Sequence, residues 1–177
     1  WWKADCREVR TYAHLLKDAD VVYHCAAAPY EGLSVFSPQV VADHTFSSTV
    51  ALLVASINAG VKRFVFCSSM SRYGHQETPF TEDMAPAPAD PYAIAKVASE
   101  EIVRNLCSLH DLEYVICVPH NVYGPGQRFW DPYRNVAGTL SLGPTNANAI
   151  SIGGSGINTT FGGAALLGGI LDRSSAA

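Results

Sequence analysis

"RFVFCSS", residues 63–69, is a short run of aromatic and β-branched residues that ends in two serines. Two similar apolar runs lie at residues 20–28, "DVVYHCAAA", and at residues 113–124, "EYVICVPHNVYG". None of the three alternates cleanly between apolar and polar residues, which is typical of strands buried on both faces of a parallel sheet. We therefore predict that these runs are strands of one parallel sheet.

Two helix-length segments separate the three runs. The first extends from about residue 38 to residue 59 and is followed by Gly60, the residue type that favours the end of a helix. The second begins with Asp90-Pro91, a capping residue followed by proline at the first helical position, and runs to about His110. A long, polar, proline-rich loop lies before this second helix, and its length favours a functional role.

A shorter helical stretch, "EVRTYAHLLKD" (8–18), precedes the first run, and a further strand could end at residues 2–5, "WKAD". The resulting order αβαβαβ predicts an α/β fold with right-handed crossovers between parallel strands. The composition changes after Gly138 to one rich in Gly, Ala, Ser and Asn. We expect a domain over residues 1–138 and a weakly ordered tail over residues 139–177.

Composition bounds the class of protein. The 177 residues are 48% hydrophobic and 16% charged, with a formal net charge of -4, which suits one domain with a real core. Mild acidity without a basic run argues against nucleic acid and against a membrane surface as partners. No stretch reads as a membrane span of roughly 18 to 20 uncharged apolar residues.

The five cysteines are odd in number and form no C-x-x-C pair. Three of them, Cys25, Cys67 and Cys117, lie in the apolar strand-like runs. We interpret the cysteines as buried free thiols in a reducing cytoplasm, and we expect no metal site because zinc-ligand spacing is absent.

Tyr92 and Lys96 are one helical turn apart and share a helix face. A tyrosine normally loses its proton near pH ~10, and a nearby ammonium favours the phenolate and lowers that pKa. The pair is a plausible general base for a sugar or alcohol hydroxyl. Tyr-x-x-x-Lys occurs by chance, but Ser68 and Ser69 end a predicted strand, at the sheet edge where ligands of open α/β sheets bind.

With these residues in place, the sequence from Asp5 to Gly126 resembles the extended short-chain dehydrogenase/reductase family, in particular its nucleotide-sugar epimerases and dehydratases. Five landmarks occur in family order: Asp5, "HCAAA" (24–28), "SSMSRYG" (68–74), "PYAIAK" (91–96) and "PHNVYGPG" (119–126). The resemblance implies a bound NAD that takes a hydride from the sugar, usually at C4.

The resemblance also implies the roles of the residues. Tyr92 would take the hydroxyl proton, Lys96 would hold the nicotinamide ribose and tune Tyr92, and Ser69 would hydrogen-bond the reacting oxygen. Further residues are expected to contact the cofactor. Asp5 and Cys6 would lie at the adenine, and Pro119 would lie near the nicotinamide. Ala26 and Ala27, in the turn after the first strand, and Ser68 would also contact the cofactor. The substrate would contact Ser69, Met70, Tyr92 and, at its diphosphate, Asn121.

The resemblance also indicates the subfamily, through two residues. Dehydratases of the family place an Asp-Glu pair where this sequence has Met70 and Ser71. This leaves an epimerase of the UDP-glucose 4-epimerase type, with a sugar-nucleotide dehydratase or reductase as a further alternative. A non-catalytic remnant or binding module of the same fold is the alternative from another functional class.

The sequence also departs from the family pattern. The glycine-rich phosphate loop G-x-x-G-x-x-G would lie before Trp1 and is not in these 177 residues. We therefore expect a partial Rossmann-like, doubly wound parallel sheet that lacks the first strands and the glycine-rich loop, with an unpaired edge on the strand at 20–28. We expect weak or absent NAD binding by this chain alone, and a homodimer through helices 38–59 and 91–110.

Overall fold

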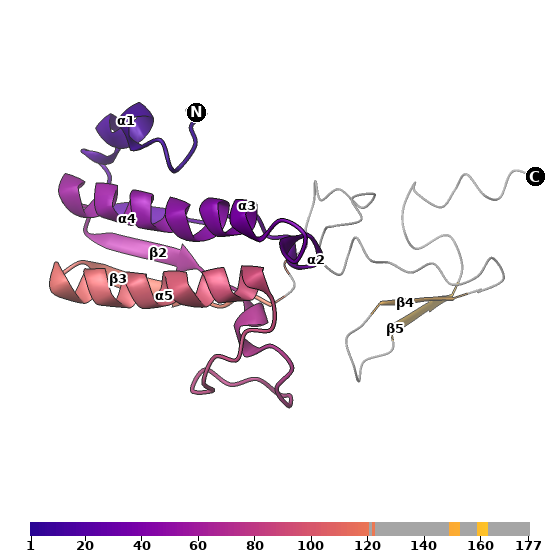
Figure 1. Ribbon diagram of the computed structural model, residues 1–177. Coiled ribbons are helices and arrows are strands. Elements are labelled where there is room, and N and C mark those ends of the chain that lie inside the picture. The colour runs from indigo at the N-terminus through magenta and orange to yellow at the C-terminus, as the bar shows by residue number, and fades with distance from the viewer. Residues whose placement is uncertain (121, 123–148, 153–158, 163–177) are drawn as a thin grey trace, which may run out of the picture.

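The computed structural model describes residues 1–120, 122, 149–152 and 159–162. Its centre is a parallel sheet of three strands, β1 (Val21–His24), β2 (Arg63–Cys67) and β3 (Glu113–Cys117), in the order β1-β2-β3 (Figure 1). The predicted α/β fold with three parallel strands is confirmed, although each strand is shorter than its apolar run. Within the described residues β1 pairs on one side only, as expected for the strand at 20–28.

The remaining elements connect these strands. Before β1 lie α1 (Val9–Tyr12) and the 3-10 turn η1 (Ala13–Leu16), and after it come α2 (Glu31–Ser34), α3 (Pro38–Ala42), the π-helical turn η2 (Asp43–Ser47) and α4 (Ser48–Ala59). The 3-10 turn η3 (Met70–Tyr73) follows β2, α5 (Pro91–Leu109) precedes β3, and β4 (Ala149–Ile152) pairs antiparallel with β5 (Thr159–Gly162).

The strand that could end at residues 2–5 is not formed, and this prediction is wrong. A strand needs a neighbour to receive its backbone hydrogen bonds, and no described segment pairs with these residues.

The helix predicted over residues 38–59 is present, but a π-helical turn interrupts it at Asp43–Ser47. The Ser48 hydroxyl donates to the His44 carbonyl oxygen at 2.8 Å, and the Thr49 hydroxyl donates to the Thr45 carbonyl oxygen at 2.6 Å. Such bonds from side chains to the preceding turn compete with the regular helical pattern.

The ends of the two long helices follow the local rules. Gly60 ends α4 in the left-handed conformation, with φ 74°. The Asp90 carboxylate caps α5 by accepting from the Ala93 backbone N–H at 3.0 Å, with Pro91 at the first helical position. Both ends are as predicted.

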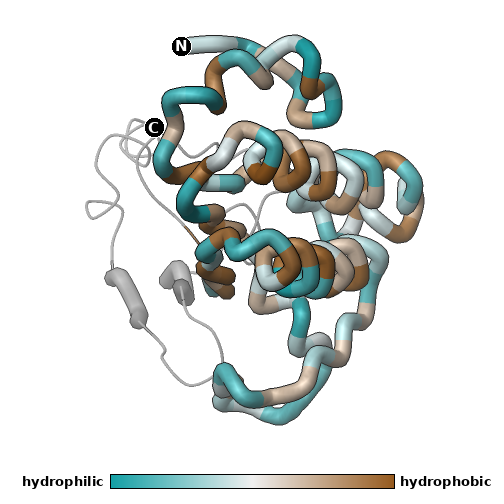
Figure 2. The backbone as a smooth tube through the Cα atoms, turned by 90° about the vertical axis from the view of Figure 1, so that its left-hand side faces the viewer, coloured by the Kyte–Doolittle hydropathy of each residue, from teal (hydrophilic) through white to brown (hydrophobic). Residues whose placement is uncertain are grey.

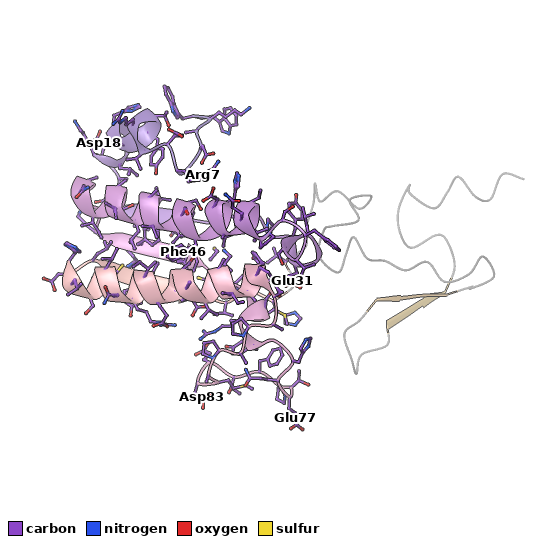
Figure 3. All side chains as sticks on the ribbon, in the orientation of Figure 1. Arg7, Asp18, Glu31, Phe46, Glu77 and Asp83 are labelled. Carbon is purple, nitrogen blue, oxygen red and sulfur yellow. The ribbon has the colours of Figure 1, made fainter. Side chains whose placement is uncertain are left out.

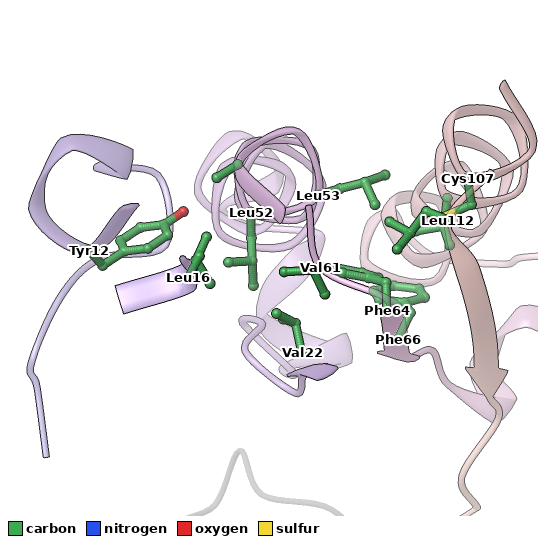
Figure 4. Close-up of a cluster of buried hydrophobic side chains, with 12 residues drawn as sticks. Tyr12, Leu16, Val22, Leu52, Leu53, Val61, Phe64, Phe66, Cys107 and Leu112 are labelled. Carbon is green, nitrogen blue, oxygen red and sulfur yellow. The ribbon is translucent and has the colours of Figure 1, made fainter. Parts of the chain in front are cut away.

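Helices α4 and α5 lie side by side over one face of the sheet (Figures 1 and 2). Figure 4 shows the core between these helices and the strands. Leu53, Phe64 and Phe66 are completely buried there, and burying one such side chain contributes about 1.5–3 kcal/mol.

The helix Pro38–Ala59 is long and apolar enough to cross a membrane by length and composition alone, which the sequence analysis did not recognise. The core helix of a globular domain meets the same criterion, and here Leu52, Leu53 and Ala55 are buried in the core.

Among the described residues no helix covers the other face of the sheet, which corrects the prediction of strands buried on both faces. Burial alternates along β1, so that Tyr23 is 71% exposed, and Val115 of β3 is 46% exposed. The described helices α4 and α5 cover a single face. On the other face Val65 of the central strand is buried, whereas Tyr23 and Val115 of the outer strands meet solvent.

Residues 74–90 form the loop between η3 and α5 and project away from the layers (Figure 3), with Glu77 and Asp83 on their outer part. In Figure 2 this loop is drawn mostly in teal and white, as its polar sequence requires. The Phe80 ring stacks on Tyr73 with centroids 4.9 Å apart, and the Ala87 backbone N–H donates to the Arg72 carbonyl oxygen at 2.8 Å. Within the loop, the Gln76 amide donates to the Ala85 carbonyl oxygen at 2.9 Å.

Candidate active site

The carboxyl ends of the three parallel strands meet at one edge of the sheet. The arrowhead of β2, the short helix α2 and the first turn of α5 all lie at this end of the molecule (Figure 1). The predicted catalytic residues belong to these elements, because Ser69 follows β2 and Tyr92 opens α5. The fold therefore brings together residues that are far apart in the sequence, at the edge where open α/β sheets bind ligands.

Ser69 links the end of β2 to the η3 turn. Its side chain caps that turn by accepting from the Ser71 backbone N–H at 3.2 Å, and its hydroxyl lies 2.8 Å from the Ser71 hydroxyl. It also lies near enough to Tyr92 to lower the pKa of that phenol. Ser69 is half-buried, so its hydroxyl is fixed in place while remaining at the sheet edge.

Tyr92 is buried in the first turn of α5, with 6% of its surface exposed. Burial raises the pKa of its phenol to about 12, and the negative charges of Glu31 and Asp90 act in the same direction. The nearby Ser69 hydroxyl lowers the pKa but does not offset burial. In this structure Tyr92 is therefore a neutral phenol at pH 7.

Lys96 follows one turn later and is 2% exposed. Its ammonium donates to the Cys67 carbonyl oxygen at 2.6 Å and lies 4.9 Å from the Phe66 ring centroid and 5.9 Å from that of Tyr92. Burial lowers the pKa of Lys96 to about 8.

The expectation that Lys96 lowers the pKa of Tyr92 is wrong for this structure. The spacing places the two side chains on one helix face as predicted, but the ammonium turns toward the end of β2. For both groups the loss of water on burial is the largest influence on the pKa.

Glu31, in α2, is a member of this cluster that the sequence analysis missed. Its carboxylate accepts from the Ser71 hydroxyl, which in turn contacts the Ser69 hydroxyl. Figure 3 shows Glu31 at the end of the molecule where α5 begins. No motif surrounds Glu31 in the sequence, and only the packing of α2 against α5 brings its carboxylate here.

Ser68, predicted to contact the cofactor, is engaged with the protein interior. Its hydroxyl donates to the completely buried carboxylate of Glu100. Arg72 and Arg104 pair with the same carboxylate at 3.2 and 3.1 Å. A buried carboxylate needs such partners, so the Ser68 side chain serves this network.

A hydrogen bond from the turn after β1, which contains Ala26 and Ala27, to Thr45 holds this turn in place. The Thr45 hydroxyl accepts from the Ala28 backbone N–H at 3.4 Å. Ala26 is exposed and Ala27 half-buried.

His24 is completely buried beneath this turn. Its Nε2 lies 2.9 Å from the Thr49 hydroxyl, which donates its own proton to the Thr45 carbonyl oxygen. Nε2 must therefore carry the proton that it donates to Thr49. Burial, followed by the charge of Lys96, lowers the pKa of His24 to about 4, so His24 is a neutral structural residue.

Asp5 and Cys6, predicted to contact the adenine end of NAD, lie in the segment before α1. Asp5 pairs with Arg7 at 2.7 Å, and the hydrogen bonds from Arg7 hold the pKa of the Asp5 carboxyl well below its usual range. The Cys6 carbonyl oxygen accepts from the Tyr12 hydroxyl at 2.6 Å.

The remaining predicted residues lie toward β3. Pro119 is half-buried, and its carbonyl oxygen accepts from the Met70 backbone N–H at 3.2 Å. Asn121 lies outside the described residues. Within the described part of the chain, no group of His, Cys, Asp and Glu side chains is arranged to hold a metal ion.

A pocket of about 480 Å³ lies on the β3 side of Met70. Ser69, Tyr92 and Lys96 do not line it. Its walls are Met70, Arg72 and Tyr73 of η3, Phe80, Thr81 and Glu82 of the projecting loop, Arg104 of α5, and Tyr114, Ile116, Val118 and His120 of β3 and its continuation.

Comparison with known proteins agrees with this arrangement. The family model described as the NAD dependent epimerase/dehydratase family matches residues 2–156. The UDP-glucose 4-epimerase of Mycolicibacterium smegmatis is 40% identical over 125 residues, which are 70% of this chain and 39% of that protein. The chain thus spans about two fifths of the length of this curated relative.

Solved structures give the same result. The UDP-glucose 4-epimerase of Thermotoga maritima with UDP-glucose has a TM-score of 0.71 at 29% identity, covering 77% of this chain and 46% of that one. The Thermus thermophilus UDP-glucose 4-epimerase complex with NAD has a TM-score of 0.70 at 28% identity, covering 77% of this chain and 44% of that one.

Proposed function

Because the chain belongs to the NAD-dependent epimerase/dehydratase family, we propose that it carries the catalytic residues of an enzyme that epimerises a UDP-activated hexose at C4. The relatives and solved structures that are UDP-glucose 4-epimerases support this proposal. The chain spans less than half the length of these relatives. The substrate class and the reaction are therefore proposed for the protein and are not shown by the comparisons.

One observation carries the proposal: Ser69 at the end of β2 and Tyr92 in the first turn of α5 lie at the same edge of the sheet, and the buried Lys96 ammonium lies 5.9 Å from the Tyr92 ring centroid. A hydroxyl, a phenol and an ammonium at the carboxyl edge of a parallel sheet form a site that can move a proton to and from a sugar hydroxyl.

The residues fit the nicotinamide half of NAD. Lys96 has three donor hydrogens, of which the structure shows one used by the Cys67 carbonyl oxygen, and Ala26 in the turn after β1 is exposed. We assign Lys96 and Tyr92 to the ribose, Pro119 to the ring, and Asp5 with Cys6 to the adenine end. When bound, NAD would supply reversible hydride acceptance and a positive charge.

Proton transfer falls to Tyr92. With its pKa at about 12, the phenol holds its proton at neutral pH and can donate a hydrogen bond to the sugar oxygen. To accept a proton it needs positive charge closer than Lys96 supplies in this structure, so the proposal requires Lys96 to leave the Cys67 carbonyl oxygen and approach Tyr92 when the site fills. Ser69, held by Ser71, would fix the orientation of the reacting oxygen.

Two residues favour an epimerase over a dehydratase. Elimination needs an acid directly after Ser69, and Met70 has none. The Ser71 hydroxyl is already donated to the Glu31 carboxylate, so it is not available to protonate a leaving group.

The test uses the full-length protein that contains these residues, with NAD and UDP-glucose, and follows UDP-galactose formation by nuclear magnetic resonance. Tyr92→Phe keeps the ring but removes the proton, so we expect kcat to fall about 10²–10⁴-fold. Tyr23→Phe changes an exposed tyrosine on the open sheet face and should leave kcat unchanged. Unchanged kcat in Tyr92→Phe would exclude Tyr92 as the base, and an inactive wild-type protein would contradict the assigned reaction.

A further inference from the structure

Three cysteines lie at the carboxyl ends of the three parallel strands. Cys67 and Cys117 are the last residues of β2 and β3 and are partners in the register. Cys25 directly follows His24, which pairs with Phe66, so Cys25 lies opposite Cys67, one residue further along the two strands. The register therefore lines up three thiols across the carboxyl edge of the sheet.

Two of these thiols are in contact. The sulfur atoms of Cys25 and Cys67 lie 3.3 Å apart, and both side chains are free thiols. A disulfide bond is about 2.05 Å long, so the sulfurs need to approach by roughly 1.3 Å. Neighbouring strands run about 4.8 Å apart, within the roughly 4.4–6.8 Å that a disulfide allows between Cα atoms. Rotation of the side chains can close the bond while the strands stay paired.

The pair is also accessible, which corrects the sequence-based interpretation of buried cysteines. Cys25 and Cys117 are exposed and Cys67 is half-buried, whereas Cys107 is buried in the core. Cys25 lies two residues after the exposed Tyr23, on the open face of the sheet. A small oxidant can therefore reach Cys25 first.

We propose that Cys25 and Cys67 form a modification site, at which a small-molecule disulfide converts the two thiols into a disulfide between neighbouring strands. The Cys25 thiolate attacks the oxidant, which releases one small thiol and leaves a mixed disulfide. The Cys67 thiolate then attacks the Cys25 sulfur and releases the second small thiol. Two electrons pass from the protein to the oxidant, which is reduced to two thiols.

The site borders the candidate active site. Cys67 directly precedes Ser68, and its carbonyl oxygen holds Lys96. The new bond would join the turn after β1 to this point of β2. The inference goes beyond the proposed epimerase function and can be tested without any assay of activity.

The second step should be slow at neutral pH. Burial, the contact with Cys25 and the charges of Cys25 and Cys117 raise the pKa of the Cys67 thiol to about 11, although Lys96 acts in the opposite direction. Because only the thiolate reacts, ring closure should accelerate about tenfold per pH unit below that pKa.

The experiment uses the reduced 177-residue chain and oxidised glutathione at alkaline pH. After incubation the free thiols are blocked with iodoacetamide, and the intact mass and the linked peptides are measured. We expect a monomer that has lost two hydrogen atoms and retains three alkylated cysteines, with a Cys25–Cys67 peptide as the main linked product.

Matched variants sharpen the result. Cys25→Ser should abolish this product, whereas Cys107→Ser and Cys117→Ser should retain it. Because Cys25 is exposed, its replacement is compatible with folding, and circular dichroism checks this. A wild-type chain that keeps five free thiols, carries only glutathione adducts or links Cys67 to Cys117 would overturn the proposal. Equal disulfide yield in Cys25→Ser would also overturn it.

Discussion

At the scale of single residues, burial determines the protonation of the candidate site more than charge does. Tyr92 and Lys96 both have pKa values shifted toward the neutral form, to about 12 and about 8, because each loses water on entering the helix–sheet interface. A bound ligand that brings charge or hydrogen bonds would change this state.

His24 gives a prediction at this scale. The folded chain keeps His24 neutral down to about pH 4, whereas an unfolded histidine binds a proton below pH 6.5. Between these values the unfolded state holds more protons, so acid favours unfolding. We expect the free energy of unfolding to fall by about 3 kcal/mol as pH drops from 6.5 to 4, measured by urea denaturation.

The control for His24 uses two glutamine variants. His24→Gln should flatten the pH dependence in this window, and His75→Gln, at an exposed loop position, should leave it intact. Equal stability of the wild-type chain at pH 6.5 and 4.5 would show that His24 is not held neutral.

At the scale of secondary-structure elements, the start of α5 positions the site. Asp90 caps this helix, and Tyr92 lies in its first turn. Fraying of this turn would move the phenol away from Ser69. The same carboxylate oxygen also accepts from the Ser34 hydroxyl at 3.4 Å, so the cap ties α2 to α5.

We predict that Asp90→Ala lowers the free energy of unfolding by about 1 kcal/mol, because it leaves backbone N–H groups of the first turn without an acceptor. Asp90→Ser restores an acceptor oxygen and should recover most of this loss. Urea denaturation of the two variants measures the difference. If both variants lose the same stability, the cap is not what Asp90 contributes.

At the scale of the whole molecule, one face of the sheet has exposed apolar side chains that no described helix covers. Val21, Tyr23 and Val115 are exposed there, and within the described residues β1 has an unpaired edge. Exposed apolar groups beside an open strand edge favour association.

Three predictions from the sequence remain predictions. They are the homodimer through helices 38–59 and 91–110, the cytoplasmic location, and the weak NAD binding of this chain alone.

We predict that the 177-residue chain self-associates through this face as its concentration rises. Tyr23→Lys should reduce the association measured by size-exclusion chromatography with light scattering, because a charge on an edge strand opposes pairing. Val54→Lys, which changes an exposed residue of α4, is the matched variant and should have no effect. A reduction in Val54→Lys alone would favour the helical interface.

The sequence by itself determined the alternation of helices and strands and the parallel sheet, and it pointed to Ser69, Tyr92 and Lys96 as candidate site residues. Apolar runs, the Asp90-Pro91 start and Gly60 act through neighbours along the chain, so their effects are visible in the sequence. The π-helical turn at 43–47 and the absence of a strand at 2–5 were not predicted, since they depend on side-chain competition and on pairing partners.

Only the tertiary structure decided what these residues contact. It turned Lys96 toward the Cys67 carbonyl oxygen, committed Ser68 to Glu100, and brought Glu31 to Ser71. It also placed the sulfur of Cys25 against that of Cys67. Each of these contacts joins segments that are far apart in the sequence, and the packing of helices on the sheet sets them, which no local pattern of residues specifies.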